Sequence, residues 1–159
     1  MPDTRDGDFE KLLFLSGRPV LFVPPNVQAE VLGCDVIVAW NSSRAAARSL
    51  SDALPILERA RRVTVVAINP TNFVNQYESF PPERIIEHLR RHTSSVEGIW
   101  LNDIPTRSTG YALQTETQKL GADLLVAGAY GHLKFWEDLM GGVTHDLLSG
   151  MKVPTLMSH

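Results

Sequence analysis

Short apolar runs that alternate with amphipathic helical segments constrain the fold of this chain more than any other feature. From Cys34 onward, strand and helix patterns alternate until five strand patterns and four helix patterns have passed. The apolar runs carry no polar alternation, which is typical of strands buried on both faces of a sheet. The sequence therefore predicts an α/β fold with a five-stranded, parallel, doubly wound sheet. The predicted strands cover residues 36–40, 63–68, 96–101, 124–127 and 153–157.

The first 33 residues lie outside this alternation. Apolar residues before Gly17 predict a short helix, and Pro19 to Val23 has the composition of a strand. The same order of Leu-Leu, Ser-Gly and a proline-containing strand recurs at the other end of the chain, in residues 147–156. We therefore divide the chain into residues 1–33, which resemble the end of a preceding domain, and one main domain at 34–159.

Composition excludes several classes of function. The chain has 159 residues, 43% of them hydrophobic and 21% charged, which suits one globular domain. The formal charge of −3 provides no basic face for nucleic acid, and no apolar run approaches the ~20 residues that span a bilayer. The single cysteine, Cys34, fits a reducing compartment, and no leader pattern opens the chain. We expect a cytoplasmic protein without nucleic acid or membrane partners.

A glycine-rich segment follows the strand predicted at 124–127. It begins with Gly128 and Gly131, continues ten residues later with Gly141, and runs into a short helix predicted at 143–148. Glycine allows the backbone to approach a ligand closely, and free N–H groups at a helix start favour an anion. The predicted phosphate-binding residues are Gly128, Gly131, Gly141, Gly142, Val143 and Thr144.

Two asparagines follow the first two strands of the main domain. Asn41 comes directly after residues 36–40, and Asn69 comes directly after residues 63–68. Ligands of open parallel sheets bind outside the carboxyl ends of the strands. We therefore expect Asn41 and Asn69 to line the same crevice as the glycine-rich segment.

The spacing Gly128-x2-Gly131-x9-Gly141 resembles the nucleotide loop of the universal stress protein family. Residues 36–41 and 121–126 share this resemblance, which extends over most of residues 34–159. It implies a Rossmann-like universal stress protein fold, an ATP site in the crevice, and pairing of two domains through their last strands. The family also contains tandem forms, in which one chain carries two such domains.

Two positions depart from the pattern of the ATP-binding family members. Asn41 stands where those members usually carry Asp, so the charge that would help to hold a metal is absent. Gly142 replaces the Ser or Thr that contacts phosphate, which removes one hydrogen bond of about 0.5–1.5 kcal/mol. The resemblance therefore implies an ATP site that is weakened at both positions.

Two functions remain open on this basis. One is a regulatory module that binds ATP or a related nucleotide and acts in stress response through dimerisation, with at most weak ATPase activity. The other is a dimerising scaffold of the same fold whose nucleotide site has decayed. A hydrolase or adenylating enzyme ranks last because no nucleophile or general base is recognisable. No catalytic residue and no metal ligand is predicted.

The expected partner is a second copy of the chain. The last predicted strand, Val153 to Met157, would lie at a sheet edge, where unpaired backbone groups accept another strand. Pro19 to Val23 is predicted to pair with it, either within one chain or by exchange between two. Pro19 and Pro154 should keep this ladder short.

Two clusters of basic side chains are interpreted as solvated surface. His88 and His92 stand four residues apart on a predicted helix, a spacing that zinc ligands can use, but no further motif accompanies them. Arg59, Arg61 and Arg62 follow another predicted helix, whose carboxyl end favours positive charge.

Overall fold

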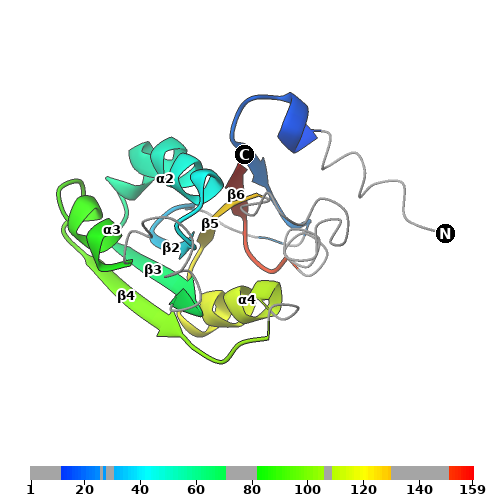
Figure 1. Ribbon diagram of the computed structural model, residues 1–159. Helices are drawn as coiled ribbons and strands as arrows, with labels where there is room; N and C mark the ends of the chain where they lie inside the picture. Colours follow the sequence, from blue (N-terminus) through cyan, green and yellow to red (C-terminus); the bar gives the residue numbers. More distant parts are fainter. Residues whose placement is uncertain (1–11, 26, 28–30, 71–81, 106–108, 130–150) are drawn as a thin grey trace.

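A six-stranded sheet forms the centre of the molecule (Figure 1), in a computed structural model that describes residues 12–25, 27, 31–70, 82–105, 109–129 and 151–159. The strand order is β1-β6-β5-β2-β3-β4. The strands are β1 (Val20–Phe22), β2 (Asp35–Trp40), β3 (Arg62–Ile68), β4 (Val96–Leu101), β5 (Leu124–Gly128) and β6 (Thr155–Ser158).

The five strands of the main domain are parallel, as the sequence predicts. Strand β2 pairs in parallel with both β3 and β5, and β3–β4 and β5–β6 are parallel as well. The chain builds outward from β2 through β3 to β4, then crosses back to place β5 and β6 on the other side of β2. The strand order therefore reverses between β2 and β5, and such a switch point is where open sheets of this kind bind ligands.

Helices cover both faces of the sheet, which confirms the doubly wound arrangement (Figure 1). Helices α2 (Arg44–Leu57) and α3 (Pro82–Leu89) pack on one face, and α4 (Thr109–Lys119) packs on the other. The side chains of β3 point to both faces of the sheet. Val63 and Val65 pack in the core beneath α2 and α3, and Val66 packs in the core on the α4 side. All three valines are at most 1% exposed.

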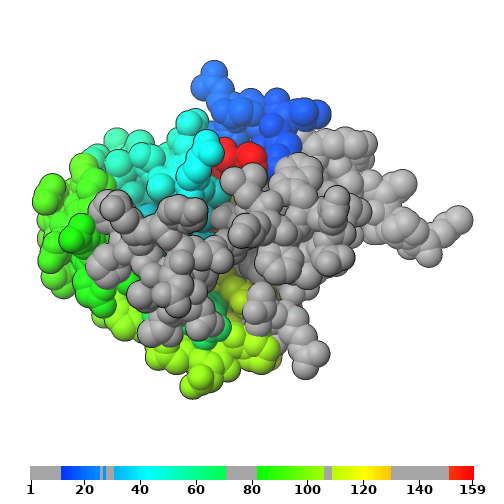
Figure 2. Space-filling view, in the orientation of Figure 1, coloured from blue at the N-terminus to red at the C-terminus, as the bar shows by residue number. Residues whose placement is uncertain are grey.

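The N-terminal segment completes the sheet within a single chain. Strand β1 pairs antiparallel with β6, and Val20, Leu21 and Phe22 lie opposite Met157, Leu156 and Thr155. Figure 2 shows this segment, in blue, against the red C-terminal residues. Leu13, in the helical turn at residues 12–15, and Phe22 are both buried in the core on the α4 side. The extra segment is therefore part of the folded domain. In the structure, β1 pairs with β6 of its own chain, which is one of the two arrangements predicted for it.

Several sequence predictions lie outside the described residues. These are the helix at 143–148, most of the loop after Asn69, and five of the predicted phosphate-binding residues: Gly131, Gly141, Gly142, Val143 and Thr144. Within the part of the chain that is described, none of the helices has the length and apolar character to cross a membrane.

Candidate functional site

The carboxyl ends of β2, β3 and β5 carry the three predicted site residues that the structure describes. Asn41 follows β2, Asn69 follows β3, and Gly128 is the last residue of β5. Val38 lies opposite Val126, so the same register continued by two residues sets Trp40 of β2 level with Gly128. The candidate site is therefore the end of the sheet at the β2–β5 switch point.

Gly128 is a strand residue whose missing side chain lets α2 approach the sheet. A Cβ at this position would lie 2.4 Å from the carbonyl carbon of Ala45 and 2.4 Å from the nitrogen of Ala46. Both are backbone atoms of the first turn of α2, so they could move only with the helix. This glycine was predicted to open a phosphate loop, and the structure shows in addition that it sets the position of a helix start.

Asn41 shapes the turn that leads into α2. Its side-chain oxygen accepts a hydrogen bond from the Ser43 N–H at 3.2 Å, and the Ser43 hydroxyl then accepts one from the Ala46 N–H at 3.1 Å. Ser43 is thus the N-cap of α2. The N–H groups of Arg44 and Ala45 are the remaining amides of the first turn that have no acceptor in the helix itself.

Asn69 joins the ends of β3 and β4. Its side-chain nitrogen donates to the Ile104 carbonyl at 2.5 Å, and its side-chain oxygen accepts from the Ile104 N–H at 3.1 Å. Its backbone has a φ of +48°, a conformation that asparagine adopts more readily than most residues. The amide therefore binds the loop after β4 and holds that loop at the carboxyl end of β3.

Trp40 is a residue of this region that the sequence analysis missed as a site residue. It ends β2 and is 6% exposed, and its indole Nε1 is buried without a hydrogen-bond partner among the described residues. A buried donor without a partner is uncommon and costs free energy. The signal in the sequence was a large aromatic residue with a polar edge in the last position of a buried strand.

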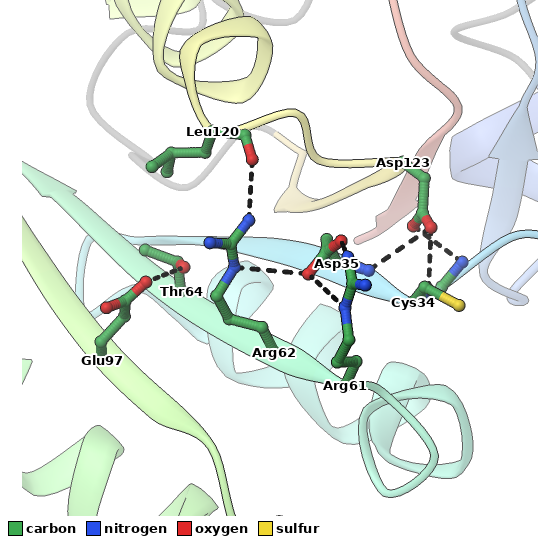
Figure 3. Close-up of polar contacts among 9 residues, drawn as sticks. Cys34, Asp35, Arg61, Arg62, Thr64, Glu97, Leu120 and Asp123 are labelled. Atoms are coloured by element: carbon green, nitrogen blue, oxygen red, sulfur yellow. Dashed lines mark hydrogen bonds and ion pairs between the residues drawn. The ribbon is translucent and has the colours of Figure 1, made fainter.

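The opposite end of the sheet carries a dense polar cluster (Figure 3). The Asp123 carboxylate accepts from the backbone N–H groups of Gly33 and Cys34 at 2.9 Å each, and from that of Asp35 at 3.4 Å. Asp123 thereby ties the segment that enters β2 to the start of β5. Because all these acceptor positions are occupied by the chain's own backbone, this cluster is structural.

The same cluster adds ion pairs to two of the three arginines predicted to be solvated: the Arg61 side chain is 77% exposed, as predicted, and that of Arg62, the first residue of β3, is 37% exposed. Arg61 and Arg62 both form ion pairs with Asp35, a carboxylate with only 9% of its side chain exposed. Arg62 also donates to the Leu120 carbonyl at 2.7 Å, across the end of α4. The hydrogen bond and the charge of Asp35 raise the pKa of the Arg61 guanidinium above its usual value, so it stays cationic. The sequence could not show that β3 begins at Arg62 and brings both arginines beside Asp35.

Comparisons with known proteins identify the fold. No protein-family model and no curated protein matches the chain. Among solved structures, a universal stress protein from Archaeoglobus fulgidus DSM 4304 superposes with a TM-score of 0.71 at 16% identity, and covers 94% of this chain and 54% of its own.

Two further structures match about four fifths of the chain. Universal stress protein UspA from Lactobacillus plantarum has a TM-score of 0.62 at 13% identity, over 82% of this chain and all of its own. A universal stress protein in complex with cAMP has a TM-score of 0.57 at 20% identity, over 79% of this chain and 95% of its own. The chain therefore has the universal stress protein fold.

Proposed function

We propose that the protein is a regulatory module of the universal stress type that binds ATP or a related nucleotide at the β2–β5 switch point. The observation that carries this proposal is the contact between Gly128 and the first turn of α2. It brings a capped helix start, with its positive dipole end, to the point where the strand order reverses. The anion suited to such a place is a phosphate group.

The proposed division of roles follows from the hydrogen bonds. Asn41 uses its oxygen to hold the turn, so its side-chain nitrogen would be the group offered to a nucleotide. Asn69 has both amide atoms bonded to Ile104, so it would act by shaping the wall. The phosphates would lie against Gly128 and against the predicted loop residues Gly131 and Gly141 to Thr144. A solved protein of this fold was crystallised in complex with cAMP, which supports a nucleotide in this fold class.

The test is a calorimetric titration of the purified chain with ATP and, separately, with cAMP. The expected result is binding of at least one of them, strengthened about three- to tenfold for ATP in Gly142→Ser, because one hydrogen bond to phosphate is regained. Mass spectrometry of the purified protein would reveal a retained nucleotide. Absence of binding in both the wild type and Gly142→Ser would overturn the nucleotide proposal.

A dimerising scaffold with a decayed site is the second candidate, and the side-chain bonds of the two asparagines favour it. Asn41 and Asn69 already have partners in the chain, and neither adds a charge for a metal-bound nucleotide. Because β1 occupies the edge of β6, a dimer through the C-terminal strand would form by exchanging β1 between two copies. We expect such a homodimer in the cytoplasm for both candidates.

Light scattering after size-exclusion chromatography tests the exchanged dimer. Deletion of residues 1–25 removes β1 and the buried side chains of Leu13 and Phe22, so the oligomeric state or the solubility should change. Deletion of residues 1–11 is the matched control, because it leaves these groups in place and should behave as the full chain. If the longer deletion also leaves the oligomeric state and the solubility unchanged, the exchange is wrong.

A further inference from the structure

A pair of histidines at the end of α3 has a geometry that the sequence alone did not show. His88 lies in the last turn of α3, and His92 lies in the turn that continues it, where the His92 N–H donates to the Leu89 carbonyl at 2.9 Å. The chain therefore keeps coiling beyond the helix, and both rings stay on one side. Their centroids are 5.1 Å apart, with an angle of 56° between the ring planes.

This separation suits two imidazoles that share one metal ion. With Zn–N bonds of about 2.0–2.1 Å and a tetrahedral N–Zn–N angle, two ring centroids lie about 5 Å apart. The observed centroid separation of 5.1 Å is close to that value. Histidines four residues apart on one helix face are also a spacing found in zinc sites.

Glu58, at the C-cap of α2, supplies the second observation. Its Oε1 lies 3.3 Å from His92 Nδ1. In metal sites, a carboxylate that accepts from one ring nitrogen of a histidine orients the ring and leaves the other nitrogen for the metal. Carboxylate partners of this kind accompany most metal-bound histidines and raise their basicity.

We propose that His88 and His92 bind a divalent transition-metal ion of the kind that imidazole prefers, such as Zn²⁺, with Glu58 as the positioning residue. Within the described residues, no group of three or more His, Cys, Asp or Glu side chains could hold a metal. The ion would therefore have two protein ligands and complete its coordination with water. Arg84, Arg90 and Arg91 in the same segment oppose a dication, so the negative charge of Glu58 matters to the site.

The site is accessible and lies away from the candidate nucleotide site. His92 has 31% of its side chain exposed, and His88 is also partly exposed, so hydrated metal can reach both rings. His88 precedes β4, and the α2 end that carries Glu58 is the end remote from Ser43. This separation makes the metal proposal independent of nucleotide binding.

The experiment is a titration of the full chain with ZnCl₂, followed by calorimetry and by the imidazole ¹⁵N resonances. We expect the His88 and His92 resonances to shift, and the affinity to fall at least about tenfold in His88→Gln and in His92→Gln, which keep side-chain size but lose the ligand. Glu58→Gln should weaken binding about tenfold and change the Nδ1 and Nε2 resonances of His92 in the metal-free protein.

His159→Gln is the matched control, because His159 lies at the other end of the molecule and packs on Phe14. Its affinity for Zn²⁺ should equal that of the wild type. Circular dichroism of each variant would show that the fold is retained. Unshifted His88 and His92 resonances at millimolar Zn²⁺, or wild-type affinity in either histidine variant, would overturn the proposal.

Discussion

The two ends of the sheet differ in how they use their polar groups. At the amino end, Asp35 and Asp123 are satisfied by two arginines and three backbone N–H groups from neighbouring segments (Figure 3). At the carboxyl end, within the described part of the chain, the side chains of Asn41 and Asn69 bond to single neighbours and the Trp40 indole nitrogen has no partner. The amino end therefore has carboxylates that are paired within the chain. The carboxyl end has neutral groups that can form further hydrogen bonds.

This difference separates stability from ligand binding. A carboxylate whose acceptor positions are filled by backbone N–H groups stabilises the fold and offers little to a ligand. A side-chain amide that still has an unbonded donor or acceptor, beside a helix start, can bind a ligand. Substitutions at the amino end should therefore lower the free energy of unfolding alone, and those at the carboxyl end should also change nucleotide affinity.

Gly128→Ala should have the largest effect. The added Cβ would lie 2.4 Å from two backbone atoms of α2, so the helix must shift. We expect the free energy of unfolding to fall by about 3 kcal/mol. Urea denaturation measures this. Gly121→Ala is the control, because Gly121 has a φ of +61° with open space around it, and should cost only about 1 kcal/mol of backbone strain. If both variants lose the same free energy of unfolding, the contact between Gly128 and α2 does not contribute to stability.

Asp123→Ala tests the amino end. Three backbone N–H groups, those of Gly33, Cys34 and Asp35, lose their acceptor, and we expect a loss of about 2 kcal/mol by urea denaturation. Nucleotide affinity should not change. Glu87→Ala, at an exposed position of α3, is the control and should stay within about 0.5 kcal/mol of the wild type. A change of ATP affinity in Asp123→Ala would show that the amino end of the sheet also affects nucleotide binding.

Asn69→Gly isolates the amide that joins β3 to β4. Glycine accepts the φ of +48°, so the variant removes the two hydrogen bonds to Ile104 without backbone strain, and about 1.5 kcal/mol should be lost. Asn69→Ala should lose more, because alanine is strained at that φ. Thermal unfolding of both variants measures the two contributions. If Asn69→Gly unfolds like the wild type, the amide does not hold the wall of the site.

Asn41→Asp should have the smallest effect on stability and the sharpest effect on function. A carboxylate can still accept from the Ser43 N–H, and negative charge is favourable before a helix start, so unfolding should change by less than about 0.5 kcal/mol. The added charge should strengthen binding of Mg-ATP if the site takes a nucleotide. Calorimetry with and without Mg²⁺ checks this. Unchanged affinity would favour the decayed scaffold, and Asn41→Ala serves as the control that loses the turn contact.

The core strands could be predicted from the sequence because burial on both faces leaves a direct signal. The apolar run at residues 63–68 became β3, and the run at 124–127 became β5 with Gly128 added. Ser43 could be predicted as a cap because serine before a helical pattern satisfies a free N–H group. These features depend on neighbours in the chain, which the sequence displays.

Contacts between distant segments could not be predicted in the same way. Nothing in the sequence near Asp123 shows that its carboxylate receives the N–H groups of Gly33 and Cys34, which lie about ninety positions earlier. The antiparallel direction of β1 and the contact between Glu58 and His92 are of the same kind. In each case the partner is chosen by how the elements pack, and local composition carries no trace of it.

The pairing of β1 with β6 also determines an order of events during synthesis. Strand β1 is synthesised before the other five strands, and its partner β6 is synthesised after them. The central pairs between β2, β3 and β4 can form much earlier, while Leu13 and Phe22 wait without the core that later buries them. During that wait the same segment can meet the finished β6 of a neighbouring chain. The concentration of nascent chains would then decide whether β1 pairs with β6 of its own chain or with β6 of a neighbouring chain.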